Sequence, residues 1–463
     1  MIDDRTATVT TVDPSTGEVL EVYATTTAAE IDAALDRASR AQAQWERSAH
    51  SVRRDLLLRL AETTRRNADR LAETASREMG KPIGEARAEV EKCSWVSEFY
   101  AESAADMLAD EQTPSAGSSS WTSYVPLGTV LAVMPWNFPF WQVYRFATAA
   151  LAAGNAGILK HSPNVTGCAL LIDEVIREAG VPDGLFQVIV VAEPDVAATI
   201  GSLLADDRIA AATLTGSERA GSSIAGAAGS AIKKVVLELG GSDPFVVRED
   251  ADLDVVIPKA VTSRFLNGGQ SCLAAKRFIV HESIREEFAT RLAEAVDGLV
   301  LGDPAEPSTQ VGPMARADLA DAVRSQIDRA VQEGGRVVTS RTESDRGRAW
   351  VAPVVMTVEP GSTVMREETF GPIAAVVGYA DDDEAVALAN DTRYGLGASV
   401  WSRDTDAALA LGRRIRSGAL FVNAVVASDP RLPFGGIKSS GFGRELGAAG
   451  IREFTNLRTV LVG

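Results

Sequence analysis

Cys272 is the residue whose type and surroundings point most directly to chemistry. It ends the segment Asn-Gly-Gly-Gln-Ser-Cys at 267–272, where two glycines permit a tight backbone path and leave the thiol approachable. A thiolate in such a turn is a good nucleophile. A cysteine taken alone is more often a small buried apolar side chain, and that interpretation fits Cys93 and Cys168, which lie in partly apolar helical stretches. We therefore expect one reactive thiol and two inert ones.

An acid and an amide stand in segments that would hold them in place. Glu238 ends the apolar run Val-Val-Leu-Glu-Leu just before a glycine pair. Burial there would raise the pKa of its carboxyl group and suit it to proton transfer near neutral pH, although a buried structural ion pair is the alternative. Asn137 lies between Pro135 and Pro139, which stiffen the chain and orient one amide. Its alternative interpretation is a turn asparagine.

Two further segments have the form of a cofactor site. Lys160 ends a short apolar strand, at the carboxyl end where open α/β sheets bind cofactors, but a solvated lysine is the ordinary alternative. Gly216 and Ser217 follow the apolar run 209–214 and open a helix, whose backbone N–H groups suit a pyrophosphate. No Gly-x-Gly-x-x-Gly fingerprint follows a strand, so the general dinucleotide motif is missing.

The elements that must position these residues follow an α/β pattern. Apolar residues recur every three or four positions from 27 to about 110, which predicts helices that come before any strand. From 139 to 240 short apolar runs alternate with amphipathic stretches, which predicts βαβ units and a parallel sheet with helices on both faces. A second α/β series from 243 to about 426 predicts another domain with its own core. The apolar end, 459–462, predicts a strand that must pair with something.

Composition narrows the function. The 463 residues include 46 Lys and Arg against 63 Asp and Glu, a formal charge of −17, so nucleic acid and membrane surfaces are poor partners. The start lacks the pattern of an export signal and no run is long enough to span a bilayer, so we expect the cytoplasm. Three scattered histidines and three scattered cysteines predict neither a metal site nor a disulfide framework.

In combination these segments resemble the aldehyde dehydrogenase superfamily over nearly the whole chain. The order of the motifs carries the resemblance: Pro135-Trp136-Asn137-Phe138-Pro139, Leu159-Lys160, Leu214-Thr215-Gly216-Ser217, Leu237-Glu238-Leu239-Gly240-Gly241, Gly269-Gln270-Ser271-Cys272, Glu368-Thr369-Phe370-Gly371-Pro372 and Pro433-Phe434-Gly435-Gly436. The succinate-semialdehyde dehydrogenase branch looks most similar, through the segments 141–145, 240–245 and 438–445.

The resemblance implies a role for each residue. Cys272 would be the nucleophile, Asn137 with the Cys272 backbone N–H would bind the oxyanion, and Glu238 would activate the water that hydrolyses the thioester. The residues implied for an NADP or NAD cofactor are Pro135, Trp136, Lys160, Ser162, Gly216, Ser217, Leu239, Glu368 and Phe370. No metal is implied.

The resemblance also implies a domain plan. Residues 1–112 and 129–240 would form a Rossmann-like cofactor domain, and 241–430 an α/β catalytic domain. Residues 113–128 and 431–463 would form an oligomerisation arm and C-terminal segment, in which the arm pairs with the terminal strand. We therefore expect a homodimer or homotetramer.

Departures from relatives shape the expected specificity. Many relatives that require NAD carry a glutamate three residues after the lysine, where this chain has Pro163, so NADP is favoured over NAD. Some relatives carry a second cysteine two residues after the nucleophile, where this chain has Ala274, so no disulfide switch is expected. Other relatives bind a substrate carboxylate through an arginine six residues before the nucleophile. This chain has Leu266 at that position. The predicted carboxylate-binding residues are Arg145, Arg264, Ser428 and Arg431.

Three interpretations of function follow. The first is oxidation of succinate semialdehyde, or a close short-chain semialdehyde, to the acid; a broad-specificity aliphatic aldehyde dehydrogenase is its alternative. The second is a catalytically silent member of the fold, which would tolerate loss of the nucleophile, amide or base that this chain retains. The third transfers the acyl group to coenzyme A, and a base at Glu238 argues instead for water.

Overall fold

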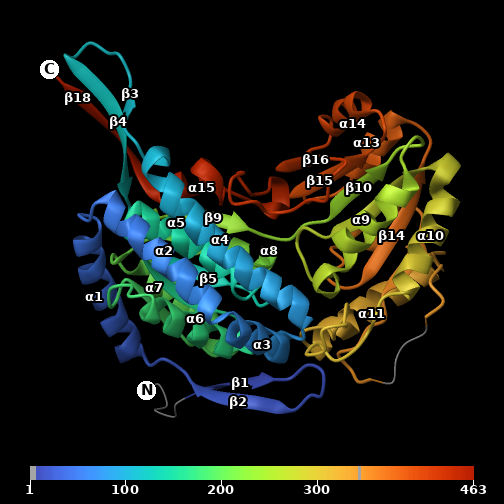
Figure 1. The fold of residues 1–463 in the computed structure, drawn as a ribbon, viewed down its shortest axis with the longest axis horizontal. Helices are drawn as coiled ribbons and strands as arrows, with labels where there is room; N and C mark the ends of the chain where they lie inside the picture. Colours follow the sequence, from blue (N-terminus) through green and yellow to red (C-terminus); the bar gives the residue numbers. More distant parts are fainter. Residues whose placement is uncertain (1–6, 342–345) are drawn as a thin grey trace.

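The computed structural model describes residues 7–341 and 346–463, and its first domain is built on a six-stranded sheet (Figure 1). The strand order is β17-β9-β8-β5-β6-β7, with all neighbours parallel except β17. Central strands are continuous apolar runs because helices cover both faces. The strands are β5 (Thr129–Met134), β6 (Ala156–His161), β7 (Phe186–Ile189), β8 (Ile209–Thr215), β9 (Lys234–Glu238) and β17 (Gly441–Phe442).

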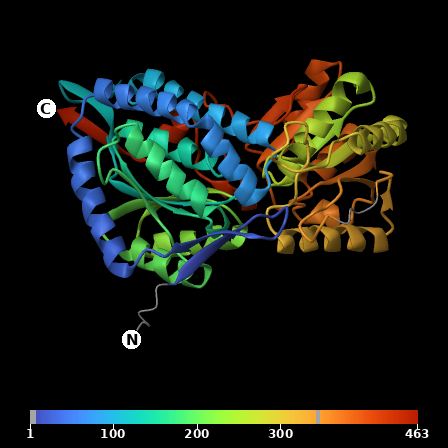
Figure 2. The same cartoon turned by 60° about the horizontal axis from the view of Figure 1, so that its bottom comes forward.

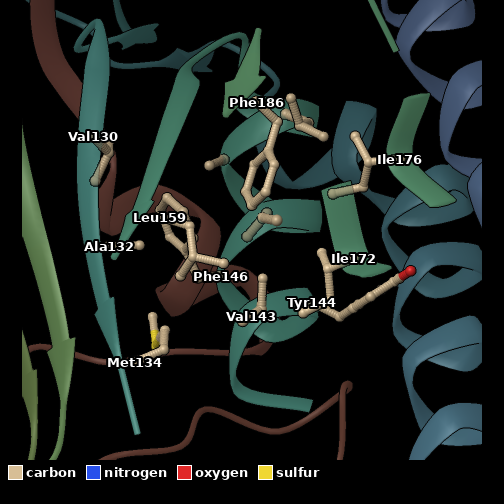
Figure 3. Packing of buried hydrophobic residues seen from close by; sticks show 14 of the residues in the cluster. Val130, Ala132, Met134, Val143, Tyr144, Phe146, Leu159, Ile172, Ile176 and Phe186 are labelled. Atoms are coloured by element: carbon tan, nitrogen blue, oxygen red, sulfur yellow. The ribbon is translucent and has the colours of Figure 1, made fainter. Parts of the chain in front are cut away.

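Helices on the two faces of this sheet connect its strands. The chain runs from β5 outward to β7 through α5 and α6, then returns through α7 to β8 beside β5. Because such crossovers are right-handed, the two halves place their helices on opposite faces, and the strand order reverses between β5 and β8. Figure 3 shows side chains of β5, β6, α5 and α6 packed in this core. The helices of this domain are α1 (Ala28–Trp45), α2 (His50–Arg66), α3 (Ala68–Met79), α4 (Ile83–Met107), α5 (Trp141–Ala153), α6 (Thr166–Glu178), α7 (Val196–Ala205) and α8 (Glu218–Ser230).

A seven-stranded sheet forms the second domain, in the order β12-β13-β14-β11-β10-β15-β16. Successive side chains of β10 enter different cores: Phe245 and Val247 belong to one buried cluster and Val246 to another. This alternation means that both faces of the sheet are covered. The strands are β10 (Asp243–Val247), β11 (Ala275–His281), β12 (Arg336–Val337), β13 (Val354–Thr357), β14 (Ile373–Tyr379), β15 (Gly397–Trp401) and β16 (Ala419–Val422); the helices are α9 (Leu253–Phe265), α10 (Arg285–Asp297), α11 (Ala317–Gln332), α12 (Thr363–Arg366), α13 (Asp382–Asn390) and α14 (Thr405–Gly412).

The N-terminal segment corrects one expectation. Helices were expected before any strand, but β1 (Thr8–Val12) and β2 (Val19–Ala24) form an antiparallel hairpin ahead of α1. Residues of β1 alternate between exposed and buried, but one of its two buried residues is Thr11, and β2 has no buried residue, so neither strand shows an apolar alternation in the sequence. The hairpin runs beneath the first domain toward the second (Figures 1 and 2), and Trp350 Nε1 donates to the Ser15 carbonyl at 3.3 Å.

The C-terminal residues serve two structures. Strand β18 (Thr455–Val462) pairs antiparallel along β4 (Ser119–Pro126), which also pairs with the short β3 (Glu111–Gln112). This sheet projects from the first domain (Figure 1) and contains the pairing that the resemblance implied. The preceding residues return to the first domain instead: β17 pairs with β9, and α15 (Gly447–Glu453) packs on α5.

Candidate active site

The carboxyl ends of four parallel strands bring most of the predicted residues to one edge of the first sheet. Val133 of β5 is in register with Lys160 of β6 and with Leu214 of β8, and Thr215 is in register with Glu238. The loop that starts at 135, the lysine, the 216–217 turn and the acid therefore share one edge, which includes the point where the strand order reverses. The second domain closes over this edge with the amino ends of its own strands.

Cys272 is held by a sharply turned loop just before β11. Asn267, Gly268 and Gly269 all adopt positive φ angles, of 56°, 60° and 74°. A Cβ atom on Gly269 would lie 2.5 Å from the Gly371 carbonyl oxygen, so glycine is required by both conformation and space. The Asn267 backbone N–H donates to Glu85 at 2.7 Å and fixes the other side of the turn.

The amide of Asn137 is fixed at both ends. Its Nδ2 donates to the Gln270 carbonyl at 3.0 Å, and its Oδ1 accepts from Gln142 Nε2 at 3.1 Å. The side chain of Asn267 donates to the Asn137 carbonyl at 2.7 Å, so the nucleophile loop and the amide are joined directly. The second N–H of Nδ2 has no hydrogen-bond partner among the described residues and could donate to a ligand.

The carboxyl group of Glu238 is buried without a partner. The residue is 2% exposed, and neither carboxyl oxygen has a hydrogen-bond partner among the described residues. Burial, and then the nearby carboxyl of Glu445, raise the pKa of Glu238 well above its usual value. A Cβ atom on Gly435 would lie 2.7 Å from Glu238 Oε1, so the Pro-Phe-Gly-Gly loop leaves the space that this carboxyl occupies. Such a group is suited to exchange a proton with a water molecule.

The thiol of Cys272 is partly buried. Burial raises its pKa to about 12, while the positive charges of Lys276 and Arg145 act in the opposite direction. The ammonium of Lys276 donates to the Cys272 carbonyl and pairs with Glu368, each at 3.0 Å. The two nearby cations therefore favour the thiolate, and burial disfavours it. By contrast, Cys93 and Cys168 are fully buried with strongly raised pKa values, as expected of inert thiols.

A cavity of about 420 Å³ reaches the thiol from one side, which is ample for a small aldehyde. Its walls come from one face of α4, from α5, from the nucleophile loop and from the loop after β16. Most of the lining is apolar or aromatic, and the polar and charged residues among it are Glu85, Glu89, Lys92, Gln142, Arg145, Thr262, Ser263, Ser271 and Ser428.

Glu368 and Phe370, the residues predicted to hold the nicotinamide ribose and ring, are linked to the Cys272 loop through Lys276. Trp136 and Phe370 meet edge to face with ring centroids 5.8 Å apart. Glu368 accepts from the Gly241 backbone N–H at 3.0 Å and pairs with Lys276. Leu239 packs so closely on α8 that a Cβ atom on Gly221 would lie 2.6 Å from it.

The residues predicted for the adenosine end fit a dinucleotide. Lys160 is 6% exposed, and its ammonium has neither a hydrogen-bond nor an ion-pair partner in the described part of the chain. Burial lowers its pKa, opposed by Glu193. Ser162 donates to Asn164 at 2.7 Å, and Ser217 caps the N-terminus of α8, which favours an anion. The Gly216 N–H already donates to the Glu238 carbonyl at 2.9 Å, so Gly216 positions the turn.

Two of the four predicted carboxylate-binding residues do not line the cavity. Arg264 is fully buried, and its guanidinium donates to backbone carbonyls of the loop at 369–373, so it holds that loop in place. Arg431 is exposed, makes a bidentate pair with Asp429 at 2.9 and 2.6 Å, and lies outside the cavity lining. Both predictions placed the residues by sequence neighbourhood, and the direction of the side chains was wrong.

The other two predicted residues do line the cavity, with partners of their own. Arg145 is 3% exposed and forms an ion pair with Glu445, and it donates to Thr215 at 3.2 Å. Ser428 accepts a hydrogen bond from the ammonium of Lys92 at 2.8 Å. The carboxylate role of both remains a prediction.

Sequence reasoning missed three charged residues of the site. The sequence pattern predicts only a helix around Lys92 and an α/β region around Lys276, and Glu445 belongs to one of the segments that resemble the family. The apolar residues around them in the sequence could have indicated these positions, because an ionised side chain is rarely buried unless it has an ion-pair partner or a function.

The fold and the site together define a class of enzyme. A thiol, a fixed amide donor and a buried acid lie between a dinucleotide-type domain and a second α/β domain. These groups are suited to oxidise a carbonyl compound through a covalent intermediate. The model of the aldehyde dehydrogenase family matches residues 1–460, and the chain belongs to that family.

Several similar proteins match this chain over nearly its whole length. A probable succinate-semialdehyde dehydrogenase [NADP(+)] of Synechocystis sp. is 46% identical over 457 residues, 98% of this chain and 99% of that protein. The succinate semialdehyde dehydrogenase [NAD(P)+] Sad of Escherichia coli is 42% identical over 450 residues, 97% of this chain and 96% of that protein. The crystal structure of a succinic semialdehyde dehydrogenase from Streptococcus pyogenes with NADP+ superposes with a TM-score of 0.94 at 33% identity, covering 98% of this chain and 99% of that one.

None of the described helices is long and apolar enough to cross a membrane. Among the same residues, no cluster of three or more His, Cys, Asp or Glu side chains is placed to bind a metal ion.

Proposed function

We propose that this enzyme oxidises succinate semialdehyde, or a close short-chain semialdehyde, to the carboxylic acid with NADP+ or NAD+ as hydride acceptor. The observation that carries the proposal is the joint placement of the Cys272 thiol, the Asn137 amide and the unpartnered Glu238 carboxyl. Relatives named for this activity that are 42–46% identical over nearly the whole chain support the substrate.

The chain's own residues supply the covalent steps. The Cys272 thiol loses its proton to solvent, and the thiolate adds to the aldehyde carbon. The carbonyl oxygen becomes the oxyanion of a thiohemiacetal, which would accept hydrogen bonds from the Asn137 amide and the Cys272 backbone N–H. The nicotinamide cofactor supplies the acceptor for the hydride that leaves this carbon. Glu238, once ionised, takes a proton from water as the water attacks the remaining thioester, and the acid and the thiol are released.

The proposed preference between NADP+ and NAD+ depends on the residues expected around the adenosine ribose. Lys160 and Ser162 would hold the adenosine ribose or its 2′-phosphate, and Ser217 with the N-terminus of α8 would face the pyrophosphate. Pro163 places no negative charge beside them. NADP+ is therefore expected to be accepted at least as well as NAD+.

The setting of the enzyme is also a proposal. All three cysteines are free, which is usual for proteins of the reducing cytoplasm. The projecting sheet carries exposed Leu457, Leu461 and Val462, which would gain by burial against another copy in a homodimer or homotetramer.

A panel of aldehydes tests the proposal. Succinate semialdehyde, butanal and other short aldehydes are supplied with NADP+ or NAD+, with and without coenzyme A, and the absorbance of the reduced nicotinamide is followed. We expect the highest kcat/KM for succinate semialdehyde, without a need for coenzyme A. An enzyme with no preference for the semialdehyde would be a broad-specificity aldehyde dehydrogenase, and no turnover at all would indicate a silent member of the family.

A further inference from the structure

The charges of the substrate cavity are nearly all matched inside the protein. The carboxylate of Glu89 pairs with Lys81 and accepts the backbone N–H groups of Phe140 and Trp141 at 2.8 and 2.9 Å. The guanidinium of Arg145 has its carboxylate partner outside the cavity lining. Neither group presents an unmatched charge to a substrate.

Lys92 is the exception. Its ammonium donates to the Ser428 hydroxyl at 2.8 Å and lies 4.3 Å from the centre of the Trp141 ring. No carboxylate forms an ion pair with it among the described residues. The remaining acid of the lining, Glu85, lies about two turns from Lys92 on the same face of α4, where it accepts the Asn267 backbone N–H at 2.7 Å, and burial raises its pKa to about 7. An ammonium in a largely apolar cavity, with only a hydroxyl and a ring face as partners, lacks the anion that would offset its desolvation.

We propose that Lys92, together with Ser428, binds the distal carboxylate of the substrate, an inference that rests on the proposed function. The aldehyde end of a short semialdehyde meets Cys272 in this same cavity, so its carboxylate must be received by another part of the lining. Lys92 supplies the positive charge and Ser428 supplies an O–H donor. The ring of Trp141 fixes the direction of the ammonium and excludes water from one side.

The test separates charge recognition from structural support. Lys92→Met keeps the length and the packing on Trp141 but removes the charge, and Lys92→Arg keeps the charge. Lys259→Met is the matched control, because Lys259 is an exposed lysine of α9 that is not part of the cavity lining. Each variant is assayed with succinate semialdehyde and with uncharged butanal, and succinate is titrated as an inhibitor of butanal oxidation.

We expect Lys92→Met to lower kcat/KM for succinate semialdehyde by about 10- to 100-fold, the usual size of a lost charge-assisted hydrogen bond, and to change that for butanal far less. Inhibition by succinate should weaken in parallel, and Lys92→Arg should keep most of the preference. A Lys92→Met enzyme that prefers the semialdehyde as strongly as the wild type, or loses both substrates equally, would overturn the inference alone. A wild type without any preference would overturn the proposed substrate as well. If Lys92→Met folds poorly, Lys92→Gln is judged by the same ratios.

Discussion

Arg145 and Glu445 form a buried ion pair close to Glu238, with side chains 3% and 1% exposed. The two residues are 300 positions apart in sequence, on α5 and just before α15. Their charges act in opposite directions on Glu238: the carboxyl of Glu445 raises its pKa and the guanidinium of Arg145 lowers it. The pair therefore helps to set the protonation of the proposed base.

Removing Arg145 should damage the enzyme as a whole. Arg145→Ala leaves Glu445 buried without a partner, which typically costs about 3–5 kcal/mol of stability. We expect a lower melting temperature and a similar loss of kcat/KM on succinate semialdehyde and on butanal. A selective loss on the semialdehyde, at an unchanged melting temperature, would instead give Arg145 the carboxylate role predicted from sequence. The double variant Arg145→Met/Glu445→Leu is the control, because removal of both charges should restore stability.

The nucleophile is tested by Cys272→Ala. Turnover should be lost, because the described site offers no other atom for the covalent adduct, while NADP+ should still quench or shift the protein fluorescence on binding. Cys93→Ala is the matched control, since that thiol is fully buried within α4 and should be dispensable. Substantial turnover by Cys272→Ala would contradict the covalent mechanism.

The base is tested by Glu238→Gln. Hydrolysis of the thioester should slow, so acyl-enzyme should accumulate and be detected by mass spectrometry of the intact protein. Because burial and Glu445 raise the pKa of Glu238, its carboxyl group ionises at a higher pH than a free glutamate, and wild-type deacylation should speed up as pH rises through that pKa. The Gln variant should lose that rise. Glu359→Gln, at an exposed acid, should behave as the wild type; a Glu238→Gln enzyme with normal turnover and no trapped adduct would argue against the base.

Cofactor choice is tested at Pro163. A glutamate there would stand near the bound 2′-phosphate, and like charges about 4 Å apart at an effective dielectric near 20 repel by roughly 4 kcal/mol. Pro163→Glu should therefore lower kcat/KM for NADP+ by up to about a thousandfold and affect NAD+ much less. Pro163→Gln, with the same shape and no charge, separates repulsion from backbone effects. Strict NAD+ dependence of the wild type would mean that another group, such as the nearby Glu193, governs the choice.

Substrate binding should depend on pH through Lys92. Burial and the positive charge of Arg145 lower its pKa to about 8, against the acids Glu89 and Asp429 and the thiol of Cys93. The ammonium is charged below this value and neutral above it, so KM for succinate semialdehyde should rise as pH increases through about 8. KM for butanal, measured in parallel, should not rise over the same pH range. The same rise in the Lys92→Met enzyme would assign the effect to another group.

Much of the chemistry could be predicted from the sequence because it depends on short segments. The turn around Cys272 needs its two glycines, the amide at 137 stands between prolines, and the acid at 238 closes an apolar strand. The α/β fold follows from the alternation of strands and helices, whose periods are local properties. These features indicated the family; in the structure Asn137 follows one strand of the first sheet and Glu238 ends another, and the Cys272 loop reaches Asn137 from the second domain.

The direction and the partners of the charged side chains were decided only by tertiary structure. Arg264 is eight residues before Cys272, but its guanidinium donates to backbone carbonyls and does not line the cavity. Lys92 is 180 residues before Cys272 and lines the cavity. Similarly, the pairing of Arg145 with Glu445 needs the C-terminal residues to return to the first domain. Burial makes the energy of a charge depend on every group around it, and those groups come from distant parts of the chain. Sequence spacing fixes which residues are available, and packing fixes which charges remain unmatched.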